Sequence, residues 1–130
     1  MMKRLFLATL LAMACIVAAS AQSVVVTYFH GKQRCITCTS IERLTKEVIN
    51  EHFANEVKAG KVKLKVVDIS TAEGKKLAKD YRITWSSLFV ENTARRTDLT
   101  RTGFQYAKKQ PDVFKKKLKA EIDTLLKKQK

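Results

Sequence analysis

The hydrophobic residues of this chain fall into short continuous runs, which alternate with segments where they recur at helical spacing. The segment "SVVVTYF" at 23–29 is β-branched and nearly unbroken, which is typical of a strand buried on both faces. Beyond Gly31, apolar residues recur at steps of three to five, which predicts a helix from about Cys35 or Cys38 to about Val57. Its apolar stripe would consist of Ile41, Leu44, Val48 and Phe53.

The middle of the chain predicts a second strand and a second helix. In "KVKLKVVDI" at 61–69, valine and leucine alternate with lysine, which indicates a strand with one wetter face, near a sheet edge. "STAEGKKLAKDY" at 70–81 begins with a Ser/Thr capping signal and continues with apolar residues spaced as in a short helix.

The last third predicts a hairpin and then a helix. "SLFVE" at 87–91 has a strand pattern, "ENTA" is its turn, and the polar "RRTDLT" at 95–100 would pair back until Gly103 breaks it. Pro111 and Asp112 suit the first turn of a helix, where proline is tolerated and an acid suits the helix dipole. The stripe of this helix would consist of Phe114, Leu118, Ile122, Leu125 and Leu126.

The predicted order of elements is therefore β-α-β-α-β-β-α, which is an α/β class. The chain has 130 residues and contains no internal repeat or linker. This length suits one domain with one modest core, which we expect over residues 22–130.

The first 21 residues have the three parts of a secretory signal peptide. Lys3 and Arg4 give a positive start, residues 5–18 are apolar and uncharged, and "ASA" ends in Ala21 with the small residues of a cleavage site. The apolar run is too short to span a bilayer as a helix of the mature protein. We therefore expect cleavage after Ala21, removal of Cys15 with the leader, and a periplasmic or secreted protein without a membrane span.

Positive charge dominates the chain, whose formal net charge is +14, and many of the lysines lie in the last predicted helix. Such a surface is compatible with nucleic acid or anionic lipid. However, the sequence holds no RNA-binding aromatic motif and no complete set of zinc-finger ligands. We interpret the lysines as a solvated helix face and expect no nucleic-acid partner.

Cys35 and Cys38 are the two cysteines that remain once the leader is removed. At a helix start, unpaired N–H groups and the helix dipole favour a thiolate on Cys35, and Arg34 and Lys32 add positive charge nearby. Cys38 lies one turn further into the helix and is more shielded. This division predicts that Cys35 attacks a substrate disulfide and that Cys38 resolves the mixed disulfide.

A C-x-x-C pair between a buried strand and an amphipathic helix resembles the thioredoxin-like superfamily. "RCITC" stands at the position of the redox motif, and "YRITWSSLFV" at that of the strand entered through a cis-proline, within a resemblance that covers about 24–126. It implies a three-layer sandwich with a mixed central sheet, and thiol–disulfide exchange with protein or small-molecule thiols. More narrowly, "YFHGKQRCITC" followed by "IE" resembles small exported bacterial proteins labelled as nitrophenyl-compound nitroreductase subunits.

Three departures from the thioredoxin pattern bear on this implied chemistry. Ile36 and Thr37 replace Gly-Pro between the cysteines, where the residues help to set the redox potential. Ser87, preceded by Ser86, stands at the cis-proline position, and a cis bond there would cost about 3–4 kcal/mol. The loop is therefore either trans and reshaped or strained. Thr27 stands where thioredoxin buries an acid that helps to deprotonate the second cysteine.

Binding of a soft metal or metalloid through the two thiols is the first alternative to exchange chemistry. His30 precedes Cys35 by five residues and is a candidate third ligand, although it fits a loop or strand end better. His52 has a zinc-finger-like spacing from Cys38, but 14 residues of helix would separate the two by roughly 20 Å. We therefore interpret His52 as an ordinary helix residue.

A non-catalytic binding module is the second alternative. Trp85, beside Ser86 and Ser87, would line the surface next to the cysteines as a substrate contact, or else belong to the core. A purely structural disulfide is disfavoured, because so short a loop constrains the unfolded chain little. We expect no cofactor and a monomeric protein.

Overall fold

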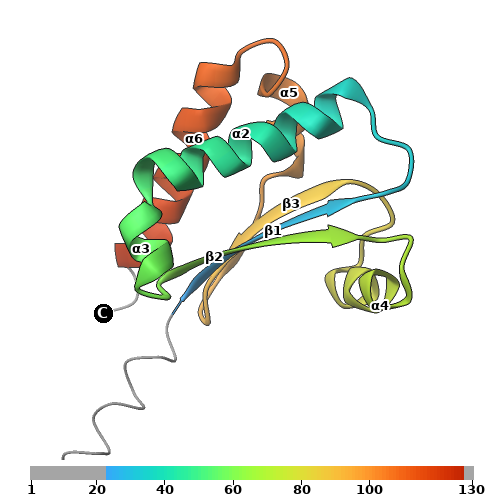
Figure 1. Ribbon diagram of the computed structural model, residues 1–130, viewed down its shortest axis with the longest axis horizontal. Coiled ribbons are helices and arrows are strands. Elements are labelled where there is room, and N and C mark those ends of the chain that lie inside the picture. Colours follow the sequence, from blue (N-terminus) through green and yellow to red (C-terminus); the bar gives the residue numbers. More distant parts are fainter. Residues whose placement is uncertain (1–22, 128–130) are drawn as a thin grey trace, which may run out of the picture.

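The computed structural model describes residues 23–127, and the predicted signal peptide with its cleavage site lies outside them. The described residues form one sheet with helices on both faces (Figure 1). In chain order the elements are β1 (Val24–His30), α2 (Ile36–His52), α3 (Ala54–Lys58), β2 (Val62–Asp68), α4 (Ala72–Tyr81), β3 (Ser87–Glu91), β4 (Arg96–Asp98), α5 (Thr100–Tyr106) and α6 (Pro111–Lys127).

The four strands lie in the order β2-β1-β3-β4. β2 runs parallel to β1, as the crossover through α2 requires, whereas β3 is antiparallel to β1 and β4 is antiparallel to β3. β2 forms one edge of the sheet and exposes Lys63 and Lys65 there. The predicted α/β class, with a mixed sheet flanked by helices, is confirmed.

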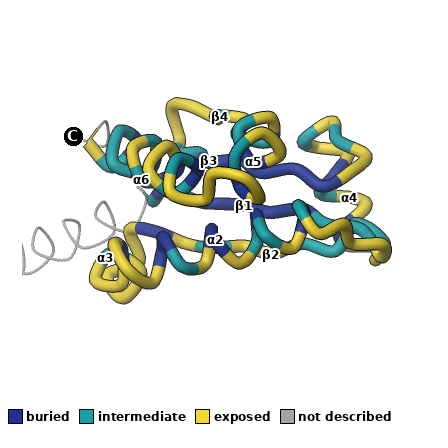
Figure 2. Tube along the Cα trace, turned by 90° about the horizontal axis from the view of Figure 1, so that it is seen from above, coloured by how far each residue is buried: buried dark blue, intermediate teal, exposed yellow. Residues whose placement is uncertain are grey.

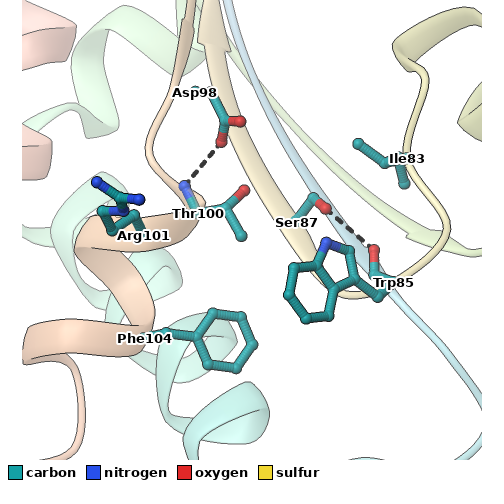
Figure 3. A pocket seen from close by; sticks show the side chains of 7 residues that line it. All are labelled: Ile83, Trp85, Ser87, Asp98, Thr100, Arg101 and Phe104. Atoms are coloured by element: carbon teal, nitrogen blue, oxygen red, sulfur yellow. Dashed lines mark hydrogen bonds between the residues drawn. The ribbon is translucent and has the colours of Figure 1, made fainter.

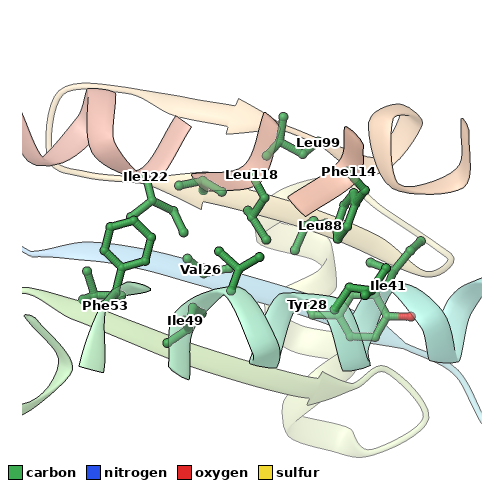
Figure 4. Close-up of a cluster of buried hydrophobic side chains, with 14 of the residues drawn as sticks. Val26, Tyr28, Ile41, Ile49, Phe53, Leu88, Leu99, Phe114, Leu118 and Ile122 are labelled. Atoms are coloured by element: carbon green, nitrogen blue, oxygen red, sulfur yellow. The ribbon is translucent and has the colours of Figure 1, made fainter. Parts of the chain in front are cut away.

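Alternate residues of β1 face opposite sides of the sheet. Val26 and Tyr28 point into the core that α2 and α6 cover (Figure 4). Phe29 points to the other face, where its ring packs against Tyr81 of α4 and Phe89 of β3 at centroid distances of 5.0 and 6.1 Å. Figure 2 accordingly shows β1 and β3 as mostly buried backbone.

The first helix is shorter than its apolar stripe predicts. α2 ends at His52 instead of near Val57, and α3 follows as a separate helix. The break falls at Phe53, whose backbone leaves the helical region (φ −128°, ψ 19°) while its ring is buried in the core. Periodicity alone could not show this break, because Phe53 fits the apolar stripe whether the helix continues through it or ends before it.

Gly103 does not end a strand, contrary to the sequence prediction. It lies within α5, a helix that the sequence analysis missed. A Cβ atom at this position would lie 2.9 Å from Ile41 Cδ1, so the glycine permits α5 to approach α2 closely. The hairpin itself is confirmed, although β4 is only three residues long.

The lysine-rich helix α6 is tied to α2 by ion pairs. Lys115 Nζ lies 3.4 Å from a carboxylate oxygen of Glu47 and 3.2 Å from one of Glu51. Because these groups are partly exposed, they contribute to orientation more than to stability. Between residues 23 and 127, no helix combines the length and the apolar character needed to cross a membrane.

Thr27 carries a buried hydroxyl that makes no hydrogen bond of acceptable geometry with any other residue of the described structure. Leaving such a group unpaired costs about 1–3 kcal/mol. We therefore expect Thr27→Val, which keeps the shape, to stabilise the protein by about 1 kcal/mol, measured by denaturant unfolding. Thr45→Val is the matched control: it removes a buried hydroxyl that donates to the Ile41 carbonyl at 2.7 Å, so it should not stabilise. Equal effects of the two changes would contradict the prediction.

Candidate redox site

Cys35 and Cys38 form a disulfide at the start of α2, with their Cα atoms 5.0 Å apart. The two sulfur atoms have different surroundings. Cys35 is exposed and is the N-cap residue of α2, whereas Cys38 lies in the first turn and is only 6% exposed. A reacting partner can therefore reach Cys35 far more easily than Cys38.

The local sequence explains why Cys35 is the cap. Its backbone is extended (φ −69°, ψ 161°), and its Sγ accepts the N–H of Cys38 at 3.0 Å. The first turn of α2 contains no acidic residue that would offset the positive end of the helix dipole. A thiolate formed on Cys35 would thus lie at the favourable end of the helix.

Tyr28 is a residue of this site that the sequence analysis missed. It is 1% exposed, and its hydroxyl donates to the Cys38 carbonyl oxygen at 2.7 Å. Burial raises the pKa of Tyr28, and it outweighs the Ser86 hydroxyl and the Arg34 guanidinium, which lie close to the Tyr28 hydroxyl and lower the pKa. The hydroxyl therefore stays protonated and remains a donor at neutral pH.

Thr27 does not take the place beneath Cys38 that the thioredoxin resemblance suggested. Adjacent strand residues point to opposite faces, and Tyr28 is the one that points to α2. The neighbour of Cys38 on β1 is thus a phenol rather than a carboxyl group. The sequence shows that Thr27 and Tyr28 point to opposite faces of the strand, but it does not show which of the two faces turns to α2.

The two predicted thiolate-stabilising cations lie in the loop before α2 and are exposed. Arg34 forms an ion pair with Glu42, which also accepts from Lys46 Nζ at 3.0 Å. Partial burial raises the pKa of Glu42, but Lys46 and Arg34 lower it more, so the pKa is below its ordinary value. Glu42 therefore remains charged and holds Arg34 beside the Tyr28 hydroxyl. Lys32 makes no ion pair with any residue between 23 and 127.

The segment Trp85–Ser87 enters β3 through trans peptide bonds, and no cis bond occurs between residues 23 and 127. Of the two expectations for this position, the reshaped trans loop is the one found. Ser87 is buried, and its Oγ donates to the Trp85 carbonyl at 3.0 Å, while Ser86 is buried beside Tyr28. Trp85 itself is 67% exposed, so it belongs to the surface and not to the core.

The described residues place no third ligand beside Cys35 and Cys38 for the alternative metal site. Within residues 23–127, no group of three histidine, cysteine or acidic side chains is close enough to hold a metal ion. His30 ends β1, and its Nδ1 lies 3.2 Å from the Gly31 carbonyl. His52 is an exposed residue in the last turn of α2, as predicted.

Tyr28→Phe should lower the free energy of unfolding of the oxidised protein by about 1 kcal/mol, because one buried hydrogen bond to the Cys38 carbonyl is lost. Denaturant unfolding measures this change. Tyr106→Phe is the control, since its ring lies under Lys117 and its hydroxyl makes no hydrogen bond with the described residues, and we expect it to have a much smaller effect. Equal losses in the two variants would show that the Tyr28 hydroxyl has no particular role.

The strand order β2-β1-β3-β4 places the cysteine pair directly after the central parallel strand, at the start of the helix that crosses to β2. This mixed sheet with helices on both faces is the arrangement that the thioredoxin-like resemblance implied. The cysteine pair stands at the start of α2, and the Trp85–Ser87 segment leads into β3, the strand that pairs antiparallel with β1.

No protein-family model and no curated protein matches the chain. A solved structure described as a malarial protein is 19% identical, with a TM-score of 0.45, over 72% of this chain and 96% of its own. A thioredoxin from Thermus thermophilus is 18% identical, with a TM-score of 0.40, over 76% of this chain and 73% of its own. The narrower resemblance to nitroreductase subunits finds no support in these comparisons.

Proposed function

We propose that the protein is an exported thiol–disulfide oxidoreductase that exchanges its Cys35–Cys38 disulfide with dithiol partners. The observation that carries this proposal is the asymmetry of the pair. Cys35 is exposed at the helix N-terminus, and Cys38 is buried one turn further on. One sulfur is thus open to attack, and the other is held close to it for the second step.

The exchange proceeds in two balanced steps. A partner thiolate attacks Cys35 Sγ, so the Cys35–Cys38 bond breaks and its electron pair leaves on Cys38 as a thiolate. The partner's second thiol then loses its proton and attacks the partner's first sulfur, which is bonded to Cys35 in the mixed disulfide. This step closes a disulfide in the partner and releases Cys35 as a thiolate. The partner is oxidised by two electrons and the protein is reduced by two. The reverse sequence uses Cys38 to resolve the mixed disulfide.

The pH dependence of alkylation of the reduced protein tests this proposal. We expect Cys35 to react with iodoacetamide at a pH well below 8.5, the pKa of a free cysteine, because the helix N-terminus stabilises the thiolate. Cys38 should react much more slowly, because it is buried. A free-thiol titration of Cys35, together with no exchange with a model disulfide, would overturn the proposal.

Export is supported by the charged start, apolar run and small-residue site within residues 1–21. Intact-mass measurement of the protein recovered from an exporting bacterial host tests it. The expected mass is that of a chain beginning at Gln22, and a full-length mass would contradict export by this route.

A further inference from the structure

A groove of about 540 Å³ opens beside the Trp85–Ser87 segment (Figure 3). Its apolar lining comes from Ile83, Trp85 and Phe104, and its polar lining includes Ser87, Asp98 and Arg101. One wall is therefore the segment that enters β3, and the other is the short helix α5.

Two exposed aromatic rings line the groove. Trp85 is 67% exposed and Phe104 is 39% exposed, and their rings stack with centroids 6.3 Å apart and planes 21° apart. Figure 3 shows the two rings as neighbours, Trp85 from the segment before β3 and Phe104 from α5. Aromatic rings bury large apolar areas at interfaces, and a pair left open to water offers that area to a partner.

Each wall is joined through one or two contacts to residues near Cys38. On the first wall, Ser86 follows Trp85 and lies against the Tyr28 hydroxyl, which is bonded to the Cys38 carbonyl. On the second wall, Gly103 precedes Phe104 and packs against Ile41, one turn after Cys38 on α2. A partner whose sulfur reacts at Cys35 would thus have its neighbouring residues within reach of this groove.

The charges around the groove favour an acidic neighbour. The Arg101 side chain is exposed and makes no ion pair or hydrogen bond with the other residues of the described range. Asp98 is the acid in the lining, and its Oδ1 accepts the N–H of Thr100 at 2.9 Å. The whole chain carries a formal charge of +14, so the long-range field also attracts acidic partners.

We propose that this groove selects the exchange partner by binding a polypeptide segment with an aromatic or large aliphatic side chain next to an acidic residue. The inference rests on the proposed function, because the groove gains its role from the neighbouring disulfide. It assigns a protein, rather than a small thiol, as the substrate. Glutathione has carboxylates that Arg101 could attract, but it has no apolar side chain to contact Trp85 and Phe104.

Trp85 is the single tryptophan of the chain, so its fluorescence reports on the groove directly. The oxidised protein is titrated with a short cysteine-free peptide that carries one phenylalanine between glutamates. We expect Trp85 emission to shift to shorter wavelengths as the ring is covered. A peptide with alanine in place of phenylalanine, and glutathione disulfide, should each bind at least about tenfold more weakly.

Variants locate the binding. Phe104→Ala should weaken the peptide about tenfold, because the stacked ring is lost. Arg101→Gln should weaken the affinity for the peptide about threefold and make that affinity less dependent on salt, because a charge contact is lost. Val57→Ala, which trims an exposed apolar residue on α3 outside the groove, should leave the affinity unchanged.

Equal affinity for the phenylalanine and alanine peptides, or unchanged binding in Phe104→Ala, would overturn the inference. A stronger response to glutathione disulfide than to either peptide would also overturn it and would indicate a small-molecule substrate. None of these titrations requires thiol chemistry, so their outcome is independent of the alkylation test. The alkylation test could therefore contradict thiol exchange while the groove still binds the peptide, or support exchange while the groove binds no peptide.

Discussion

Replacing Cys38 with serine is expected to turn a protein that releases its partners into one that stays bonded to them. Cys35 remains exposed at the start of α2 and still attacks a partner disulfide. The second step lacks its thiol, which the native fold holds in position to bridge Cys35 (Cα–Cα 5.0 Å). In the variant an external thiol must do what the Cys38 thiol does in the native protein, where it is already held beside Cys35. We therefore expect turnover to fall by about 100-fold or more.

Non-reducing electrophoresis and intact-mass measurement detect the accumulated mixed disulfide when reduced protein is mixed with an oxidised protein substrate. Cys35→Ser is the matched control, because it removes the same number of sulfur atoms but leaves only the buried Cys38. We expect it to form almost no adduct. If both variants formed adducts equally, the assignment of Cys35 as attacking atom would be wrong.

Gly74→Ala is expected to destabilise the fold by about 3 kcal/mol or more, because an added methyl group has no space. A Cβ atom at this position would lie 1.8 Å from the Asp68 carbonyl oxygen and 2.9 Å from Thr71 Oγ1. The carbonyl is backbone at the end of β2, so it cannot rotate away as a side chain would. The first turn of α4 would have to leave its cap at Thr71, which accepts the Gly74 N–H at 3.0 Å.

Denaturant unfolding of the oxidised protein measures this effect. Gly31→Ala is the control, because a Cβ atom there meets nothing within 4 Å. We expect that change to alter the free energy of unfolding by no more than about 0.5 kcal/mol. A Gly74→Ala protein as stable as this control would show that the approach of α4 to β2 is loose.

The order of the strands and longer helices could be predicted because burial imposes simple periods on the sequence. The run at 23–29 is buried in the middle of the sheet, and Phe114, Leu118 and Ile122 of α6 are buried as their spacing predicts. The predicted start of the first helix also placed the cysteine pair, because Cys35 is the N-cap residue of α2. These features depend on neighbours in the sequence.

The features that the sequence could not reveal depend on contacts between distant segments. Gly103 resembles a breaker in isolation, and only Ile41 on the facing helix explains why it lies inside α5. The place of Tyr28 beneath Cys38 depends on which face of β1 turns to α2. The groove likewise joins Trp85 with Phe104, which are 19 positions apart and carry no shared motif.

The position of β2 at the sheet edge has a consequence for self-association. An edge strand of seven residues presents unpaired backbone groups that a second unfolded or native chain could join. Lys63 and Lys65 are exposed along this edge, so two copies aligned there would bring like charges together. The alternating lysines therefore act as gatekeepers against intermolecular strand pairing, and this protection weakens as salt screens them.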